Sequence, residues 1–484
     1  MVRVQQYQIP GLGHLSTLLV DDATGTAVVV DPRRDVDVYL GAAQRDDLRI
    51  SHVIETHLHN DYVSGGRDLA ALTGATHVIG AGAELRYEAR GVRGGETIDV
   101  GELRLTVLDT PGHTPESVSY TVTDTSRADE PLLMLTGGSL LVGAVGRTDL
   151  LGADSAPAFS AAMYRSLHEV ILPHEDSVAI YPTHGAGSLC STGIGSTTWS
   201  TIGFERRHDP LLAPMEVDAF ARALLAGQPA FPRYFARMRP INQGGPRLLD
   251  GVIPAVPGLS VAAMDDVVAG GGLVVDAREP AAHAAAHIPG SLSIPVGSSF
   301  GTWLGWVVDH DRPLVVVVDD VADLDELQRQ AFRIGHESIV GHLTGGFTAW
   351  LAAGRPTESN GVISAEGLAR SLDTAAGTDR PLVIDVRQAA EYDAGHVPGA
   401  IHIGAGSLPD RLDTLPRDRP IVTTCASGYR ASVASSILRS AGFVDVTWVA
   451  DGFDAWAAAG HRYETGGAAG EIVTTGSEGA GHSH

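Results

Sequence analysis

The chain of 484 residues has 58 acidic against 34 basic side chains, which gives a formal net charge of −24, and 44% of its residues are hydrophobic. Such an acidic surface disfavours nucleic acid and anionic membranes, because both bind clustered positive charge. No apolar run reaches the roughly 20 residues that span a bilayer, and the first residues lack the apolar core of a signal peptide. We therefore expect a cytoplasmic protein of several domains that binds neither nucleic acid nor membrane.

Only two cysteines occur, Cys190 and Cys425. Their number excludes a disulfide framework and a thiolate-rich zinc module, and it fits a reducing compartment. Any thiol chemistry therefore belongs to one of these two residues. Cys190 has no adjacent cation, which favours an inert thiol at that position.

Residues 1–247 alternate short apolar runs with glycine-rich turns and helical stretches, a pattern typical of an α/β domain. The predicted strands include Ala27–Val30, His52–Glu55, Leu103–Leu108 and Leu132–Leu135. The run Arg239–Pro246 is rich in turn residues and indicates the end of this domain.

Two histidine motifs follow predicted strands in this domain. Thr56-His-Leu-His-Asn-Asp-Tyr62 comes after one strand, and Thr110-Pro-Gly-His-Thr-Pro-Glu-Ser117 comes after another. Imidazole and carboxylate groups at strand ends are the ligand set of zinc or non-haem iron. The candidate metal ligands are His57, His59, Asp61 and His113.

These motifs resemble the metallo-β-lactamase fold and, within that superfamily, the persulfide dioxygenases. The signature of the fold is His-x-His-x-Asp-His with a later Pro-Gly-His. Two further runs support the likeness, Gly137–Leu150 with its Arg147 and Asp149, and Pro182–Cys190. The resemblance implies an αββα sandwich and one mononuclear Fe(II) site, with zinc as the alternative metal.

Two positions depart from the family pattern. Gly138 stands where the family has an aspartate that binds iron, and Tyr62 stands where it has a histidine of a second metal position. The resemblance therefore supplies two of the three iron ligands, His57 and His113.

Three alternatives stay open for this site. His59 or Asp61 completes it, or water takes the place of the carboxylate, or the domain has lost its metal and serves as a scaffold or substrate binder. His184 belongs to the second metal position of the fold. Because Tyr62 replaces the expected histidine of that position, we expect His184 to be structural.

Residues 259–357 and 360–463 repeat one pattern. The first copy contains Leu273–Arg278, His287–Ser291 and Gly345–Trp350, and the second contains Leu382–Arg387, His396–Ala400 and Asp451–Trp456. Asp276 precedes His287 by 11 positions, and Asp385 precedes His396 by the same 11. Each copy is predicted to be a compact α/β domain in which a buried strand ends at Asp-x-Arg.

A reactive thiol loop lies in the second copy. The strand Pro420–Thr424 runs into Cys425-Ala-Ser-Gly-Tyr-Arg430, and Ala431–Arg439 has helical periodicity. A cysteine between a strand and a helix lies among unpaired backbone N–H groups, which stabilise a thiolate and any anion bound to it. Arg430 adds a positive charge to the same turn. We therefore expect Cys425 to be a nucleophile.

The second copy resembles a rhodanese domain. The likeness rests on Asp385-Val-Arg387, Glu391, Gly395-His-x-Pro-Gly399, the Cys-x-x-Gly-x-Arg loop and the Gly-Phe-x-x-Trp ending. It implies that Cys425 takes up sulfane sulfur with Arg430, that the loop residues Ala426, Ser427, Gly428 and Tyr429 bind the substrate, and that the domain needs no cofactor. The loop is Cys-x4-Arg, one residue shorter than in the related phosphatases, which favours sulfur transfer over phosphoryl transfer.

The first copy resembles the same domain without its nucleophile, because Val315–Asp320 occupies the corresponding place. The whole chain thus resembles fusions of a persulfide dioxygenase with a silent and an active rhodanese domain, and a homo-oligomer is in keeping with that resemblance. The glycine-rich residues 464–484 are expected to form a disordered tail.

The leading hypothesis is an enzyme of sulfur metabolism that acts on low-molecular-weight thiol persulfides, thiosulfate or sulfite. Cys425 would form a persulfide, and an Fe(II) site would oxidise a thiol persulfide to sulfite with O2. One alternative is sulfur transfer beside a metal-free N-terminal scaffold. The other is a zinc-dependent thioester or lactone hydrolase fused to a sulfurtransferase.

Overall fold

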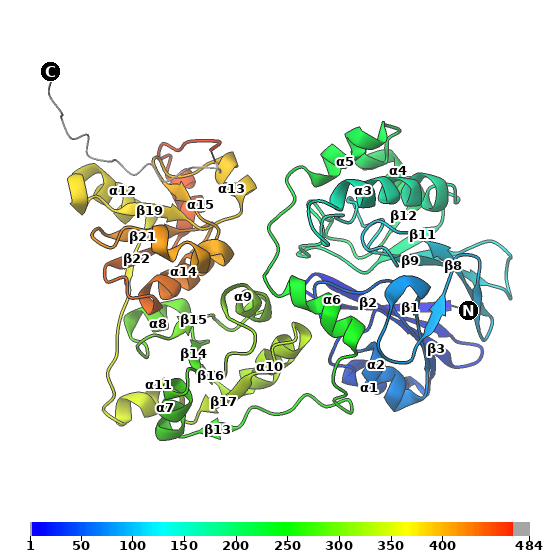
Figure 1. Cartoon of the computed structure of the whole chain (residues 1–484), viewed down its shortest axis with the longest axis horizontal. Helices are drawn as coiled ribbons and strands as arrows, with labels where there is room; N and C mark the ends of the chain where they lie inside the picture. The colour runs from blue at the N-terminus through cyan, green and yellow to red at the C-terminus, as the bar shows by residue number, and fades with distance from the viewer. Residues whose placement is uncertain (1, 468–484) are drawn as a thin grey trace, which may run out of the picture. The chain divides into compact units, whose positions relative to one another are not determined.

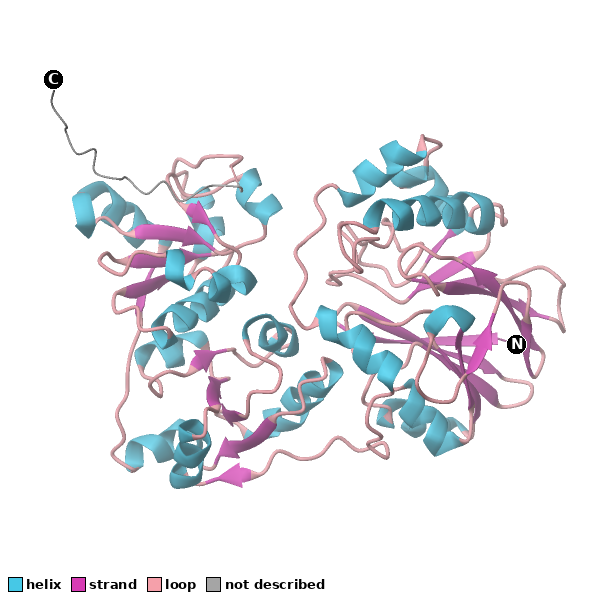
Figure 2. Ribbon diagram, in the orientation of Figure 1, coloured by secondary structure: helices cyan, strands magenta, loops and turns pink. Residues whose placement is uncertain are grey.

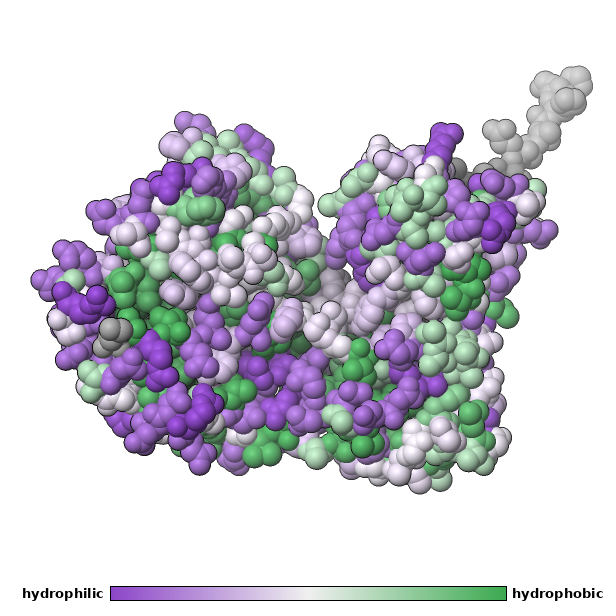
Figure 3. Space-filling view, turned by 180° about the vertical axis from the view of Figure 1, so that it is seen from behind, coloured by the Kyte–Doolittle hydropathy of each residue, from purple (hydrophilic) through white to green (hydrophobic). Residues whose placement is uncertain are grey.

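The computed structural model describes residues 2–467, and these form two compact units (Figure 1). The first comprises the residues up to Leu259 together with Val296–His342, and the second comprises Ser260–Pro295 and the described residues from Leu343 onward. No described helix is long and apolar enough to cross a membrane. Exposed apolar side chains lie in small groups between polar ones, as Figure 3 shows for one face.

The first unit contains two sheets of six strands each. One runs in the order β1-β2-β3-β4-β5-β6, with β1 (Val2–Ile9), β2 (His14–Asp21), β3 (Thr26–Val30), β4 (Arg49–Ile54), β5 (Thr76–Gly80) and β6 (Arg90–Val92). The other runs in the order β12-β11-β10-β9-β8-β7, with β7 (Thr97–Val100), β8 (Leu103–Asp109), β9 (Val118–Asp124), β10 (Leu133–Gly137), β11 (Ala179–Pro182) and β12 (Ser200–Thr201).

The alternation of side chains along the strands explains how these sheets pack. Leu19 of β2 and Leu133 of β10 both lie in the core between the sheets. Leu18 points the other way, into a layer formed with α1 (Asp37–Asp46) and α2 (Gly66–Thr73). Met134 points outward into a layer formed with α3 (Ala156–Arg165), the π-helix Ser166–Ile171, α4 (Ile202–His208) and α5 (Val217–Leu225). Figure 2 shows these four layers, which confirm the predicted αββα sandwich.

The run Arg239–Pro246 is not a turn over its whole length, because Phe235–Gly244 forms helix α6. Pro240 lies inside this helix and removes one backbone hydrogen bond. Long-range contacts offset that loss. Arg239 forms a two-pronged ion pair with Glu116 at 2.9 and 3.0 Å, and Asn242 donates hydrogen bonds to two backbone carbonyls of the first histidine motif.

A buried ion pair anchors helix α10 (Leu324–Arg333) within the first unit. Arg333 donates to the carboxylate of Asp35 at 2.6 and 2.9 Å, and both side chains are almost fully buried. Burial acts to raise the pKa of Asp35, but Arg333 outweighs burial and lowers that pKa from 3.8 to about 2. Because the folded pKa is depressed, the pair stabilises the fold above pH 4 and loses that effect as the pH falls toward 2.

Replacing Arg333 by leucine is therefore expected to lower the free energy of unfolding by about 3–5 kcal/mol, because it leaves the buried Asp35 carboxylate without its main partner. The denaturant midpoint at neutral pH measures the loss, and the difference between variant and parent should shrink between pH 4 and pH 2. The control is Arg237→Ala, which breaks an exposed pair with Asp311 and should cost about 1 kcal/mol or less. Equal losses in the two variants would contradict this assignment.

The two predicted repeats each contain a five-stranded sheet, and the two sheets have the same strand order. The order β13-β17-β16-β14-β15 involves β13 (Gly258–Leu259), β14 (Leu273–Asp276), β15 (Leu292–Ser293), β16 (Leu314–Val317) and β17 (Ile339–Leu343). The order β18-β22-β21-β19-β20 involves β18 (Gly361–Ile363), β19 (Leu382–Asp385), β20 (Ile401–His402), β21 (Ile421–Thr424) and β22 (Val446–Val449). The neighbouring strands pair in parallel, as in β14–β15 and β19–β21, which confirms the predicted fold class.

The α-helices of the two repeats follow a similar order, except that the second repeat has the 3-10 segments Ala405–Asp410 and Leu412–Thr414 where the first has α9. They are α7 (Val261–Ala269), α8 (Pro280–Ala285), α9 (Phe300–Val307), α10 and α11 (Gly346–Ala352) in the first repeat. In the second they are α12 (Ala365–Thr374), α13 (Ala389–Ala394), α14 (Tyr429–Ser440) and α15 (Gly452–Ala458).

Arg387 forms a buried framework in the second repeat. Its guanidinium donates to Asp385 at 2.6 Å and to the backbone carbonyl of Gly395 at 2.5 Å, and it lies 4.3 Å from the centre of the Phe453 ring. The Asp-x-Arg motif thus ties the end of β19 to helix α15.

Arg278 makes the same set of contacts in the first repeat. It donates to Asp276 at 2.6 Å and to the carbonyl of Ala286 at 2.8 Å, and it lies 3.9 Å from the centre of the Phe347 ring. The motif residues therefore serve the framework in both copies. The domain boundaries stay a prediction, and the predicted tail 464–484 lies outside the described residues from position 468.

Candidate functional site

Cys425 lies where β21 ends and the loop to helix α14 begins. Its side chain is 1% exposed, and the backbone N–H of Gly428 donates to its sulfur at 3.1 Å. Parallel strands end at one edge of the sheet, so the thiol lies at the edge where α14 starts. The loop thereby offers a backbone donor to negative charge on sulfur, as the sequence predicted.

Two glycines fix the shape of this loop. Gly428 has φ +97°, and a Cβ there would lie 2.3 Å from the carbonyl oxygen of Ala450. Gly452 has φ +66°, and a Cβ there would lie 2.1 Å from the carbonyl oxygen of Ala426. The next residue, Phe453, donates its N–H to the carbonyl of Cys425 at 2.7 Å. The Gly452-Phe453 ending of the repeat therefore packs against the backbone of the thiol loop and hydrogen-bonds to it.

Arg430 lies on the first turn of α14 and forms a two-pronged ion pair with Glu391 at 2.6 and 2.7 Å. Burial acts to lower the pKa of Arg430, but Glu391 and Cys425 outweigh burial, so the net pKa is raised. The guanidinium therefore keeps its charge beside the thiol loop. Of the predicted substrate-binding residues, Ser427 is exposed, Ala426 and Tyr429 are partly buried and Gly428 is buried. Their role in binding stays a prediction.

In the N-terminal domain the structure brings three imidazoles together. One ring nitrogen each of His57, His113 and His184 lies within 4.8 Å of the others, and all three side chains are buried. His57 follows β4, His113 follows β8, and His184 follows β11. The strands of both sheets thus deliver one histidine each to a common point, a geometry that suits a metal ion.

Hydrogen bonds orient two of these rings. His113 Nδ1 lies 2.8 Å from the carbonyl oxygen of Arg147, so this nitrogen donates and Nε2 keeps its lone pair. His113 Nε2 has no hydrogen-bond partner among the described residues, although it is buried. His57 Nδ1 lies 2.8 Å from the hydroxyl of Thr56. Burial lowers the pKa of His113 to about 3 and holds that of His57 well below 6.5, so both rings are neutral.

The structure does not bring His59 into this group. His59 Nε2 lies 3.2 Å from a carboxylate oxygen of Asp31 and 3.1 Å from one of Glu55. Burial acts to lower the pKa of His59, but Asp31 and Glu55 outweigh burial and raise it to about 10. The raised pKa favours the protonated imidazolium form of His59, which lies between the two carboxylates.

Asp61 contacts the side of the His184 ring that faces away from His57. One of its carboxylate oxygens is 3.3 Å from His184 Nδ1, whereas His184 Nε2 is 3.4 Å from His57 Nε2. Sequence reasoning set His184 aside as structural, yet it stands in the histidine cluster. The sequence signal for it was the strand-end motif Pro-Thr-His-Gly.

Gly138 confirms that the cluster has no carboxylate at this position. A Cβ built on Gly138 would lie 2.3 Å from His113 Cδ2, so the ring of His113 occupies the space that a longer side chain would need. Tyr62 is turned away as well, because its hydroxyl donates to the backbone carbonyl of Asp31 at 3.3 Å. The donor set is three imidazoles, and its unpartnered buried nitrogen fits a bound metal ion.

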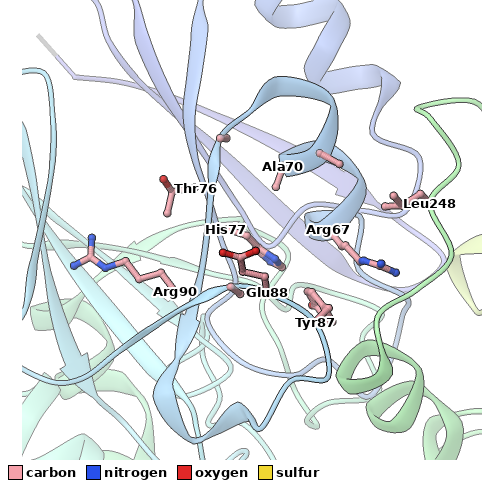
Figure 4. A pocket seen from close by; sticks show the side chains of 11 residues that line it. Arg67, Ala70, Thr76, His77, Tyr87, Glu88, Arg90 and Leu248 are labelled. Carbon is pink, nitrogen blue, oxygen red and sulfur yellow. The ribbon is translucent and has the colours of Figure 1, made fainter.

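A cavity of about 620 Å³ lies in the same domain (Figure 4). None of the predicted site residues lines it; the lining side chains include Arg67, His77, Tyr87, Glu88, Arg90 and Leu248. The lining residue His77 lies 3.5 Å from Glu55, the carboxylate that also pairs with His59.

Comparison with known proteins agrees with both halves of this arrangement. The rhodanese-like domain family matches residues 261–353 and again 368–459, and the metallo-beta-lactamase superfamily matches residues 9–128.

The N-terminal part is similar to the mitochondrial persulfide dioxygenase ETHE1 of Homo sapiens, with 31% identity over 207 residues, which cover 40% of this chain and 70% of that protein. The Bos taurus protein of the same name is 29% identical over 248 residues, covering 49% of this chain and 81% of its own length.

Among solved structures, a metallo-beta-lactamase from Staphylococcus aureus is 30% identical, with a TM-score of 0.64, and the match covers 70% of this chain and 98% of that one. The chain therefore belongs to the persulfide dioxygenase group of the metallo-β-lactamase superfamily and carries two rhodanese-like domains fused behind that fold.

Proposed function

We propose that this enzyme of sulfur metabolism transfers sulfane sulfur through a persulfide on Cys425. The observation that carries the proposal is the thiol loop, in which the N–H of Gly428 donates to the Cys425 sulfur at 3.1 Å and Arg430 begins the following helix. The first repeat lacks such a thiol, because Val318 follows β16 where Cys425 follows β21. Only the second repeat then transfers sulfur.

The reaction is a two-step covalent exchange. The Cys425 thiolate attacks the outer sulfur of thiosulfate or of a low-molecular-weight thiol persulfide. A new S–S bond forms to Cys425, the old one breaks, and sulfite or the thiolate leaves with the electron pair. An acceptor thiolate, sulfite or cyanide then attacks the outer sulfur, and Cys425 leaves as the thiolate. The backbone N–H groups of the loop and Arg430 stabilise the negative charge on sulfur in both steps.

Replacing Arg430 by alanine is expected to lower kcat/KM for thiosulfate:cyanide transfer by about a hundredfold, because one positive charge leaves the thiol loop. The matched control is Arg439→Ala, which removes an arginine from the same helix that pairs with Glu358 at 3.2 Å, away from the thiol. That control should keep the parent's rate. Full activity in Arg430→Ala would show that the guanidinium only holds Glu391 and takes no part in transfer.

We also propose that His57, His113 and His184 hold a metal ion in the N-terminal domain. The support is the buried Nε2 of His113, which has no partner among the described residues and lies with the other two imidazoles. Iron(II) bound there would supply the activation of O2 for oxidation of a thiol persulfide to sulfite. The chain's own part is to orient the rings of His113 and His57, through the Arg147 carbonyl and the Thr56 hydroxyl, and to keep these two buried rings neutral.

The competing functions of this domain differ in their metal content. A persulfide dioxygenase requires iron and O2 uptake with glutathione persulfide, whereas a zinc-dependent thioester or lactone hydrolase requires zinc and no O2. A metal-free scaffold shows neither metal nor uptake but keeps thiosulfate:cyanide transfer. Metal analysis of protein purified without a tag, together with O2 uptake, separates the three. The cytoplasmic location and the homo-oligomer stay predictions.

A further inference from the structure

The cation of the thiol loop, Arg430, is paired with a carboxylate that sulfur transfer does not need as a reactant. Both terminal nitrogens of its guanidinium donate to the two carboxylate oxygens of Glu391, at 2.6 and 2.7 Å. Burial acts to raise the pKa of Glu391, but the hydrogen bonds from Arg430 outweigh burial and lower that pKa, so the carboxylate is ionised at neutral pH. A fixed negative charge therefore offsets the positive charge of the loop.

The start of helix α13 holds Glu391 in this position. Glu391 is the third residue of the helix, and its carboxylate accepts a hydrogen bond from the backbone N–H of Gln388 at 3.0 Å. The side chain of Gln388 accepts the N–H of Glu391 in return, which completes a capping box. The carboxylate is thus bound by the helix cap as well as by Arg430, so its place beside the loop does not depend on a bound substrate.

The silent repeat lacks both members of this ion pair. Ala282 is the third residue of helix α8, at the place that Glu391 has in α13. Asp323 stands at the place of Arg430, because each lies five positions after the first residue that follows the central strand. The Asp-x-Arg framework is nevertheless present in both repeats. The pair therefore accompanies the nucleophile and not the fold, which assigns it to the chemistry of the thiol loop.

The carboxylate changes how strongly the loop attracts anions of different charge. The Coulomb energy of a sulfur donor in the loop is proportional to the charge of that donor. A dianion therefore gains about twice as much as a monoanion from a guanidinium, and it loses about twice as much when a carboxylate offsets that guanidinium. Glu391 thus weakens the binding of doubly charged donors more than that of singly charged ones.

We propose that Glu391 sets the charge preference of the sulfur-transfer site and shifts it from dianionic thiosulfate toward singly charged donors such as low-molecular-weight thiol persulfides. The proposal rests on the proposed function of Cys425. The attack is the same for both donors, because the new S–S bond forms to Cys425 and the electron pair of the old bond leaves with sulfite or with the thiolate. Glu391 takes no part in these bond changes and acts through the field at Arg430.

The experiment compares two sulfur donors that share the attacked bond but differ in charge. Thiosulfate is a dianion that releases sulfite, whereas methanethiosulfonate is a monoanion that releases methanesulfinate. For each donor, kcat/KM is measured with the full chain and with cyanide as acceptor, after subtraction of the uncatalysed rate. In Glu391→Gln protein the ratio of kcat/KM for thiosulfate to that for methanethiosulfonate should rise about five- to tenfold. Glutamine removes the charge but keeps the size of the side chain and its place in the capping box.

Two further variants separate the charge of Glu391 from its other roles. Glu391→Asp keeps the negative charge and should keep the ratio close to that of the parent protein. Glu366→Gln is the matched control, because it removes one negative charge from helix α12 of the same repeat, where the carboxylate forms an exposed pair with Arg370 at 3.5 Å. That control should leave both kcat/KM values unchanged. A mass gain of one sulfur atom on Cys425 verifies that each variant keeps a working thiol loop.

An unchanged ratio in Glu391→Gln protein that still takes up sulfur overturns the proposal. An equal loss of kcat/KM for both donors overturns it as well, since Glu391 would then only support Arg430. A rise of the same size in Glu391→Asp or Glu366→Gln protein would show that the charge beside the loop is not the cause. A parent protein that takes sulfur from neither donor instead overturns the function of Cys425, and this proposal with it, so the two failures are told apart by the parent.

Discussion

Replacing Cys425 by serine is expected to reduce sulfur transfer from thiosulfate to cyanide by about a thousandfold or more, to the level of the uncatalysed exchange. The serine hydroxyl keeps the size of the side chain, but it does not ionise near neutral pH and forms no persulfide. The Gly428 N–H and Arg430 then have no sulfur anion to stabilise. Initial rates over a range of thiosulfate concentrations measure the loss.

The first repeat provides the matched control for this variant. Val318 follows β16 as Cys425 follows β21, so Val318→Ala changes the corresponding position of the silent copy. It should leave the rate of transfer unchanged, because no step of the exchange passes through that repeat. Substantial transfer by folded Cys425→Ser protein would remove the basis for the proposed function.

Replacing His113 by alanine is expected to strip the N-terminal domain of the metal in the three-histidine cluster. His113 supplies a neutral imidazole whose orientation is already set by the Arg147 carbonyl, so its loss should cost more than the roughly 10–100-fold in affinity that loss of an outer partner costs. Metal content per chain after purification without a tag, and a chelator titration, measure the change.

His208→Ala is the control, because His208 is an exposed histidine at the end of helix α4 of the same domain. It should keep the metal content of the parent protein. If His113→Ala protein holds as much metal as the parent, then the cluster is not a metal site and the scaffold alternative gains support.

The sequence predicted the features that depend only on one strand and the loop that follows it. The edge position of Cys425 follows from β21 running directly into a glycine-containing turn and a helix. The doubled Asp-x-Arg motif predicted two related domains, and the structure shows Arg278 and Arg387 making matching contacts. The αββα layers were implied by the family resemblance, and the structure shows how successive strand residues such as Leu18 and Leu19 pack into different layers.

Local sequence predicted His57 and His113 but did not predict which other residue joins them, because that depends on contacts between distant segments. His184 reaches the cluster because the backbone carbonyl of Thr183, at the strand end, accepts a hydrogen bond from the N–H of Leu15 in the other sheet. His59 lies next to His57 in its motif, but Asp31, 28 positions earlier in the chain, draws it into an ion pair.

Helix α6 shows the same limit. Its sequence contains Pro240 and several turn residues, and it is helical because Arg239 and Asn242 meet partners far away in the chain. Propensity is a weak guide where such tertiary contacts decide the outcome.

The most direct test of the central claim is the intact mass of the protein after brief exposure to thiosulfate and rapid removal of excess reagent. The account predicts that the parent protein gains the mass of one sulfur atom, that cyanide removes this gain, and that peptide mapping assigns it to Cys425. Cys425→Ser protein should gain nothing. A sulfur atom that is found on Cys190 instead, or a parent protein that turns over without ever carrying added sulfur, would contradict the account.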